Sequence, residues 1–255
     1  MNILIKNENG QSMIKVYDFT LPKENYVHAI FNSIAAKYDL MNWMMSFGIH
    51  HLWCRQLLKL INIPHGGIIL DACCGTGSVT HELARKTKPQ TRIIGLDFSE
   101  AMLGIAKSRL NSYISANKIE LIQANATAIP FPDHSFDCVT IAYGLRNSAD
   151  PKVLLQEIER VTKPGGQVVS LEIMKPSSMV LRTFYNIHLH YWVPSLGKIL
   201  VHDRDAYRYL HDSIFSFIDQ HQLTAIFKEL GFLQIRSYQL TLGIAAIHIG
   251  IKPLS

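Results

Sequence analysis

A strand, a glycine turn and a helix follow one another in residues 68–86. The apolar run 68–70 is typical of a buried parallel strand, and Asp71 ends it. Gly75 and Gly77 carry no Cβ, so the backbone there can turn tightly and approach a ligand. Apolar residues then return at helical spacing. This order is the first half of a nucleotide-binding βαβ unit, although a G-x-G turn alone is a weak signal because many such turns bind nothing.

The next apolar run, residues 92–97, also ends in a carboxylate. Asp97 lies 20 residues after Gly77, the spacing at which an acidic residue accepts hydrogen bonds from ribose hydroxyls. Thr80 replaces the third glycine of the G-x-G-x-x-G motif, and a dinucleotide pyrophosphate needs that helix N-terminus close and bare. The pattern favours a ribosyl ligand without phosphates, of which S-adenosylmethionine (SAM) is the commonest.

Strands and helices alternate five times up to residue 173, and an antiparallel pair, 233–240 and 244–252, closes the chain. We therefore predict an α/β fold with a doubly wound, mostly parallel seven-stranded sheet, which is Rossmann-like. Asn125 and Ala126 follow the third strand at the edge where such sheets bind ligands. They either read an adenine edge or form a simple Asn turn.

Two helical stretches lie outside this alternation, and the first sixteen residues have the composition of a frayed end. The aromatic and Met-rich segment 37–53 belongs either to a helix pair packed on the sheet or to a flap over the ligand. A helical insertion before the last two strands would roof the sheet edge and form an apolar slot. We expect one domain: N-terminal helices or flap (1–62), SAM-binding core (63–175), substrate roof (176–231) and closing strands (232–255).

Composition excludes several classes of protein. The 255 residues are 48% hydrophobic, enough for one sizeable core. A net charge of +5 suits an anionic membrane surface or an acidic ligand, while the absence of a Lys/Arg block argues against nucleic acid. The four cysteines form no C-x-x-C pair, so neither a metal site nor a disulfide framework is indicated. Without a signal-like start or an apolar run of about 18 residues, we expect a cytoplasmic protein.

A longer set of motifs carries a family resemblance. The chain resembles the ubiquinone/menaquinone biosynthesis C-methyltransferases, a SAM-dependent group with the class I methyltransferase fold. The resemblance runs from about Phe31 almost to the C-terminus. Its motifs are Lys37–Asn42, Ser46–His50 with Leu52 and Trp53, Asp71–Thr80, Gln123–Ala126, Pro130–Asp133, Phe136–Cys138, Gly144–Asn147, Lys163–Gly166, Lys175 with Pro176, Tyr207–Leu210, and Asp219 with Gln220.

The chain departs from this family at a few positions. Cys73 and Cys74 replace the usual Gly-Gly, and Ser78 replaces Asp. A cysteine cannot take a positive φ cheaply, so we expect the loop to lie somewhat differently around the methionine part of SAM. Leu242 replaces a residue that is commonly Gly or Ala, and Ile249 one that is commonly Arg.

The resemblance implies a set of cofactor contacts. Thr76 and the backbone of the two loop glycines would hold the methionine end of SAM, and Asp97 the ribose. Tyr38 and Asp39 would close over the sulfonium from the flap. The remaining implied cofactor residues are Asp71, Gly75, Gly77, Asn125, Ala126 and Ala142, the last through its backbone alone.

The resemblance also implies the chemistry. The ortho carbon of a prenylated quinol would attack the methyl group of SAM once the phenolic proton has left. Arg146 and Asn147 are expected to orient the quinol oxygen and stabilise its developing negative charge. A water held by Arg146, Asp39 or a tyrosine is the expected proton acceptor. His50 and His248 are interpreted as structural histidines.

The identity of the acceptor stays open in the sequence. We favour demethylmenaquinol, with 2-polyprenyl-6-methoxy-1,4-benzoquinol or another small molecule as alternatives. A nicotinamide-dependent reductase is disfavoured, because no tyrosine has a lysine four residues later. A SAM- or prenylquinone-binding subunit without catalysis remains open, as do peripheral membrane contact and a homodimer.

Overall fold

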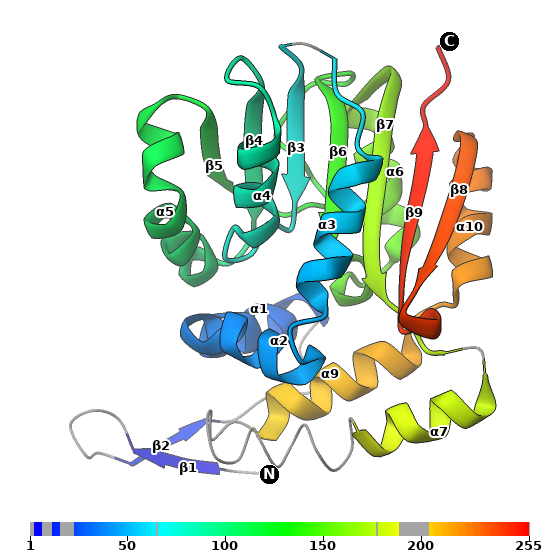
Figure 1. Cartoon of the computed structure of the whole chain (residues 1–255). Coiled ribbons are helices and arrows are strands. Elements are labelled where there is room, and N and C mark those ends of the chain that lie inside the picture. Colours follow the sequence, from blue (N-terminus) through cyan, green and yellow to red (C-terminus); the bar gives the residue numbers. More distant parts are fainter. Residues whose placement is uncertain are drawn as a thin grey trace.

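The computed structural model describes residues 3–6, 12–15, 23–64, 66–176, 178–188 and 204–254. Its centre is a seven-stranded sheet with the strand order β5-β4-β3-β6-β7-β9-β8 (Figure 1). Five strands are parallel, whereas β9 pairs antiparallel with both β7 and β8, as predicted. The strands are β3 (Ile68–Ala72), β4 (Arg92–Asp97), β5 (Ile119–Gln123), β6 (Phe136–Ala142), β7 (Thr162–Ile173), β8 (Leu233–Leu240) and β9 (Ala245–Ile251).

The order of the parallel strands reverses at β3. The chain passes from β3 to β4 and β5 on one side and then returns to β6 on the other. Open α/β sheets bind ligands beyond the carboxyl ends of the strands at such a point. The topology therefore locates the candidate site at the ends of β3, β4 and β6, which point downward in Figure 1.

Helices cover both faces of the sheet. On one face, α3 (His50–Leu60), α4 (Ser78–Lys86) and α5 (Glu100–Ser115) bury Leu57, Leu83 and Leu110 against the strands. On the other, α6 (Pro151–Val161) and α10 (Gln220–Glu229) bury Ile158 and Phe227. The α10 position departs from the predicted roof, because this helix packs on the sheet and does not lie over its edge.

A third group of helices lies across the carboxyl edge of the sheet (Figure 1). It contains α1 (Lys23–Ile34), η1 (Ala35–Lys37), α2 (Tyr38–Ser46) and α9 (Arg204–Ser216), which share a core that includes Ile30, Ile34, Met41 and Ile214. The helix α7 (Met179–Ile187) lies at the same end of the molecule. Both interpretations of the N-terminal helices thus apply, since α3 packs on the sheet while α1 and α2 cover its edge.

Two local expectations differ from the structure. The segments β1 (Ile3–Lys6) and β2 (Ser12–Lys15) pair as an antiparallel hairpin where a frayed end was expected. The strand β7 begins at Thr162, before the glycines that were expected to separate it from α6. Gly165 adopts a φ of 74° and the register with β6 shifts there, so the glycines form an irregularity within the strand.

His248 is fully buried on β9, away from the candidate site. Its Nε2 atom lies 3.1 Å from the carbonyl oxygen of Gln220, and its ring packs against Phe227. Burial lowers the pKa of His248 to about 4, because a protonated ring at this position would lack hydration by water. The placement agrees with the interpretation of His248 as a structural histidine.

Acidification should therefore destabilise the fold through His248. The unfolded imidazole gains a proton as pH falls below about 6.5 whereas the folded one does not, so stability is lost between about pH 6.5 and 4. Going from pH 7 to 5 should cost wild type about 2 kcal/mol more than His248→Gln, measured by urea unfolding. The control His221→Gln, at an exposed position, should retain the wild-type difference. Equal pH dependence in wild type and His248→Gln would contradict this account.

Candidate active site at the carboxyl edge of the sheet

The loop between β3 and α4 is fixed to the neighbouring strand. The Cys74 amide donates to the carbonyl of Leu96 over 3.0 Å. Gly77 has a φ of 76°, and a Cβ there would lie 2.9 Å from a Leu110 methyl group, so only glycine fits. A Cβ at Gly75 would meet no atom within 4 Å. Gly75 therefore leaves open space beside the loop, where a ligand can approach the backbone.

The carboxylate of Asp97 holds this loop from β4. One oxygen accepts the Gly75 amide over 2.8 Å, and the other accepts the Ser99 amide over 2.9 Å. Burial raises the pKa of Asp97, while these backbone donors oppose that shift by stabilising the charged form. Each oxygen retains a lone pair beyond its amide bond. The group is thus an acceptor suited to a pair of vicinal hydroxyls.

Two small cavities of about 60 and 40 Å³ meet around Asp97. The first continues past Phe98 to Asn125 and Ala126, at the end of β5. The second continues toward Gly75, Ala142 and Tyr38. Both cavities also contact Cys73, Phe98, Gly144 and Asn147. The predicted adenine, ribose and methionine positions therefore follow one another in the order that the parts of SAM require.

The helix α1 covers these cavities from outside. Val27 lines the first cavity and Phe31 the second. Asn32 accepts a hydrogen bond from the hydroxyl of Ser99, which also caps α5. His28 packs on Phe98 with ring centroids 5.3 Å apart. Sequence reasoning did not identify α1 as part of the site, because its apolar residues have ordinary helical spacing.

Three of the predicted cofactor residues support the loop from outside the two cavities. Asp71 is buried in β3, where it accepts hydrogen bonds from the hydroxyls of Thr80 (2.6 Å) and Thr140 (2.8 Å). Burial raises the pKa of Asp71 to about 6. The Thr76 hydroxyl is turned toward α2, and Gly77 packs on α5. The polar side chains of Asp71 and Thr76 are thus used within the fold, and direct contact of these three residues with the cofactor stays a prediction.

Asp39 is also placed differently from the expectation. Its carboxylate forms an ion pair with Arg109 of α5 and accepts the Thr76 hydroxyl over 2.7 Å. The Ser78 hydroxyl accepts from the same guanidinium over 2.6 Å. Asp39 thus connects α2 to the loop and to α5, and it lies outside the cavities. Its neighbour Tyr38 does line the second small cavity, and burial raises the pKa of that phenol.

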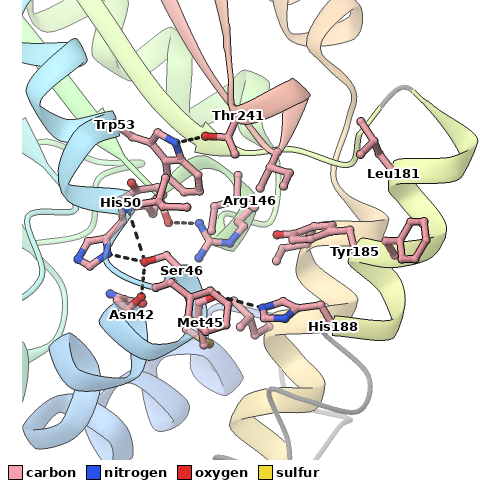
Figure 2. Close-up of a pocket in the computed structure, with 18 of the residues that line it drawn as sticks. Asn42, Met45, Ser46, His50, Trp53, Arg146, Leu181, Tyr185, His188 and Thr241 are labelled. Carbon is pink, nitrogen blue, oxygen red and sulfur yellow. Dashed lines mark hydrogen bonds between the residues drawn. The ribbon is translucent and has the colours of Figure 1, made fainter.

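A larger cavity of about 310 Å³ lies beyond Tyr38 (Figure 2). Its wall also includes Trp53 of α3 and Tyr185 of α7, and Thr241 of η4 (Thr241–Gly243) accepts a hydrogen bond from the Trp53 indole over 2.8 Å. Tyr38 and Tyr143 line both this cavity and the smaller one that contains Gly75. An apolar compartment therefore adjoins the predicted methionine position.

A buried ion pair supplies the charge in the larger cavity. The guanidinium of Arg146, on η2 (Leu145–Asn147), donates to Glu172 over 2.5 Å and to the Tyr143 carbonyl over 3.0 Å. Burial disfavours its charge, but Glu172 outweighs this, so the pKa of Arg146 is raised. Its Nε atom is buried and finds no hydrogen-bond partner among the described residues. Arg146 is therefore a permanent cation with an unused donor beside the cavity.

Asn147 lies apart from its neighbour. Its amide nitrogen donates to the Tyr143 carbonyl over 2.8 Å, and its oxygen accepts the Tyr209 hydroxyl over 2.8 Å. The side chain lines the two small cavities, whereas Arg146 lines the large one. The structure therefore brings Arg146 but not Asn147 to the larger cavity, and a contact of Asn147 with the quinol oxygen stays a prediction.

His50 lines the larger cavity but is held by α2. The Ser46 hydroxyl lies 2.7 Å from the Asn42 carbonyl and 2.6 Å from Nδ1 of His50. Because the single hydroxyl proton goes to the carbonyl, Nδ1 is the donor in the second contact. Burial, aided by His51, lowers the pKa of His50 to about 4. His50 is thus neutral near pH 7 and fixed within the wall.

Sequence reasoning missed Glu172, Phe98 and the tyrosines Tyr143 and Tyr185. Glu172 carried a usable signal, because a carboxylate at the end of a buried strand needs a cationic partner. Tyr143 did not, since its φ of 60° and its position between two cavities appear only in the structure. Among the described residues, no group of His, Cys, Asp and Glu is arranged to hold a metal ion.

The strand order, the glycine loop and the cavity at Asp97 define a class I SAM-dependent methyltransferase. Solved structures show the same fold. A methyltransferase from Thermotoga maritima has a TM-score of 0.63 at 19% identity and covers 89% of this chain and 99% of its own. A methyltransferase from Aquifex aeolicus has a TM-score of 0.56 at 16% identity and covers 78% of this chain and 88% of its own.

The particular family follows from sequence comparison. Residues 19–252 match the model of the ubiE/COQ5 methyltransferase family, and the chain belongs to this family. A protein from Hahella chejuensis, named ubiquinone/menaquinone biosynthesis C-methyltransferase UbiE, is 39% identical over 90% of this chain and 92% of its own. A demethylmenaquinone methyltransferase from Bacillus cytotoxicus is 38% identical over 91% of this chain and 98% of its own.

One departure from the family has a measurable cost. Cys73 adopts a φ of 56°, so the loop keeps the left-handed conformation although glycine is absent. Such a conformation costs a residue with a Cβ roughly 1–2 kcal/mol. Cys73→Gly should therefore be about 1 kcal/mol more stable than Cys73→Ala in urea unfolding, reversing the usual advantage of Ala. At the control position Ser108, within α5, Ser108→Ala should be more stable than Ser108→Gly. An equal or opposite order at position 73 would show that the loop relaxes.

Proposed function

We propose that this enzyme transfers the methyl group of SAM to a ring carbon of a prenylated quinol. The observation that carries this proposal is the meeting of a ribose-compatible cavity and an apolar cavity at Tyr38 and Tyr143. The names of the relatives from Hahella chejuensis and Bacillus cytotoxicus support it. Bound SAM supplies an electrophilic methyl group on a positively charged sulfur.

The residues around the small cavities fit this donor. Asp97 accepts the ribose hydroxyls, and the Gly75 backbone leaves room for the methionine part. Asn125 and Ala126 border the adenine position, and the backbone of Ala142 borders the opposite end. The indirect contributions come from Asp71, Thr76 and Asp39, which hold the loop in place.

The residues around the larger cavity fit an aromatic ring with a hydrocarbon tail. Its lining is largely apolar, so it excludes water from the ring. Arg146 lines this cavity as a permanent cation, and it stabilises the negative charge that develops on the quinol oxygen as the hydroxyl proton leaves to a water molecule. Arg146 is not the proton acceptor, because its pKa is raised.

We favour demethylmenaquinol as the acceptor and keep the benzoquinol of ubiquinone biosynthesis as the alternative. Because the proposed quinol carries a prenyl tail, we propose that the protein works from the cytoplasm at a membrane surface. We also keep a homodimer as a proposal. No helix in the described part of the chain is both long and apolar enough to cross a bilayer. Mass spectrometry of the quinones in a deletion strain would identify the acceptor, because the unmethylated precursor accumulates.

Removal of the Asp97 carboxylate should abolish donor binding. Asp97→Ala deletes the acceptor for two ribose hydroxyls and releases the Gly75 amide, so affinity for S-adenosylhomocysteine should fall about 100-fold or more. Isothermal titration calorimetry measures this directly. The matched control Glu120→Ala removes a half-exposed carboxylate from β5 and should bind normally. Normal binding by Asp97→Ala would refute the ribose assignment.

Neutralising the buried ion pair should remove turnover and spare donor binding. Arg146→Gln alone would strand Glu172 without a cation, so the informative variant is Arg146→Gln/Glu172→Gln, in which no buried charge is unpaired. Its kcat should fall about 100-fold or more, while its affinity for S-adenosylhomocysteine stays within about threefold of wild type.

The control for this experiment is the exposed pair of Lys152 and Glu229. The double variant Lys152→Gln/Glu229→Gln removes the same charges from the surface and should turn over normally. Full turnover by the Arg146 and Glu172 double variant would show that the guanidinium does not act on the quinol.

A further inference from the structure

Exposed apolar side chains gather around the larger cavity, and one of them, Phe184, also lines it. On α2, Asn42 and Met45 face the cavity, while other side chains of the same helix face solvent. We define the apolar rim as six residues of α2, α7 and η4 that are between 49% and 73% exposed: Leu40, Trp43, Val180, Phe184, Ile187 and Leu242.

The helix α7 shows the arrangement most clearly. Leu181, Tyr185 and His188 recur at helical spacing and line the cavity (Figure 2). Val180 and Ile187 lie on another side of the helix and are exposed, and none of its nine residues is buried. A helix that is apolar toward solvent as well as toward the protein has an unsatisfied face. The geometry of α7 therefore calls for an apolar medium outside the cavity wall.

The charges on α2, α3 and α7 match an anionic surface, although the exposed Asp212 of α9 lies beside His211, which contacts Asn186 of α7. The helices α2, α3 and α7 contain one acidic residue, Asp39, and that carboxylate is paired with Arg109. Arg182 is exposed on α7, and Arg55 and Lys59 are exposed on α3, which rises away from the rim (Figure 1). A cation one or two turns above an apolar layer is at the level of lipid headgroups.

We propose that the apolar rim docks on the surface of a fluid bilayer that contains anionic lipid. The rim enters the boundary between headgroups and acyl chains, and the cavity opens directly to the hydrocarbon. The proposal rests on the proposed function in one respect, the prenyl tail of the quinol. A cavity of about 310 Å³ holds a ring and little more, so the tail must leave through the wall and would otherwise lie in water.

The test is flotation of the full-length protein with vesicles. Wild type should float with vesicles of phosphatidylglycerol and phosphatidylcholine, and less with phosphatidylcholine alone. Val180→Gln/Ile187→Gln should lower the partition coefficient at least about tenfold, which corresponds to about 1.4 kcal/mol. Its thermal midpoint should match wild type, because both side chains are exposed and neither lines the cavity.

A matched control removes the same kind of surface elsewhere. Leu233 at the start of β8 and Leu254 near the C-terminus are 54% and 81% exposed, at the opposite end of the sheet from η4. Leu233→Gln/Leu254→Gln should partition as wild type does. Equal partitioning of the rim variant and wild type, or failure of wild type to float with either vesicle, would overturn the proposal.

A soluble substrate separates docking from catalysis. Turnover of a naphthoquinol with one isoprene unit, without vesicles, reports the proposed function alone and should be equal in wild type and the rim variant. Flotation without any turnover would leave the docking surface standing and refute the function. Turnover without flotation would support the proposed function and refute the docking surface. A dimer that the rim variant dissociates, with no vesicle binding, would assign the rim to a second copy and overturn the proposal.

Discussion

The carboxylate of Asp97 joins three parts of the molecule at one point. It ends β4, it holds the glycine loop through the Gly75 amide, and it orders the start of α5 through the Ser99 amide. Ser99 in turn anchors α1 over the cavities through Asn32. A buried carboxylate is costly unless it is bonded, so these contacts and the charge stabilise one another. The edge of the sheet is consequently shaped for a ligand before any ligand arrives.

Fold and cofactor position were the parts most accessible from sequence. Buried parallel strands leave continuous apolar runs, and the glycines and Asp97 stand at spacings fixed by backbone geometry. These are local signals, and the structure confirms the predicted seven-stranded, mostly parallel sheet with its closing antiparallel pair. The direction in which a polar side chain points depends on neighbours that are distant in sequence. Asp39 and Thr76 were therefore placed in the cavity by resemblance, although Arg109, 70 residues beyond Asp39, directs both away from it.

The same limit applies to charge. Arg146 was recognised as a candidate from its motif, but its ion pair with Glu172 spans two strand ends and has no local signature. The pair lets a cation remain buried beside an apolar cavity, with its charge balanced by Glu172. At Cys73 the resemblance did indicate the local conformation, because the family usually has glycine there. The loop keeps a positive φ at this cysteine, since its contacts fix the backbone.

The helix α1 borders the two small cavities but not the larger one. Its residues Val27 and Phe31 close the nucleoside side, and the Lys23 ammonium donates to the Arg146 carbonyl over 3.2 Å. The larger cavity is walled by other helices, α2, α3, α7 and α9. Because the two compartments border different helices, donor and acceptor need not share one route to solvent.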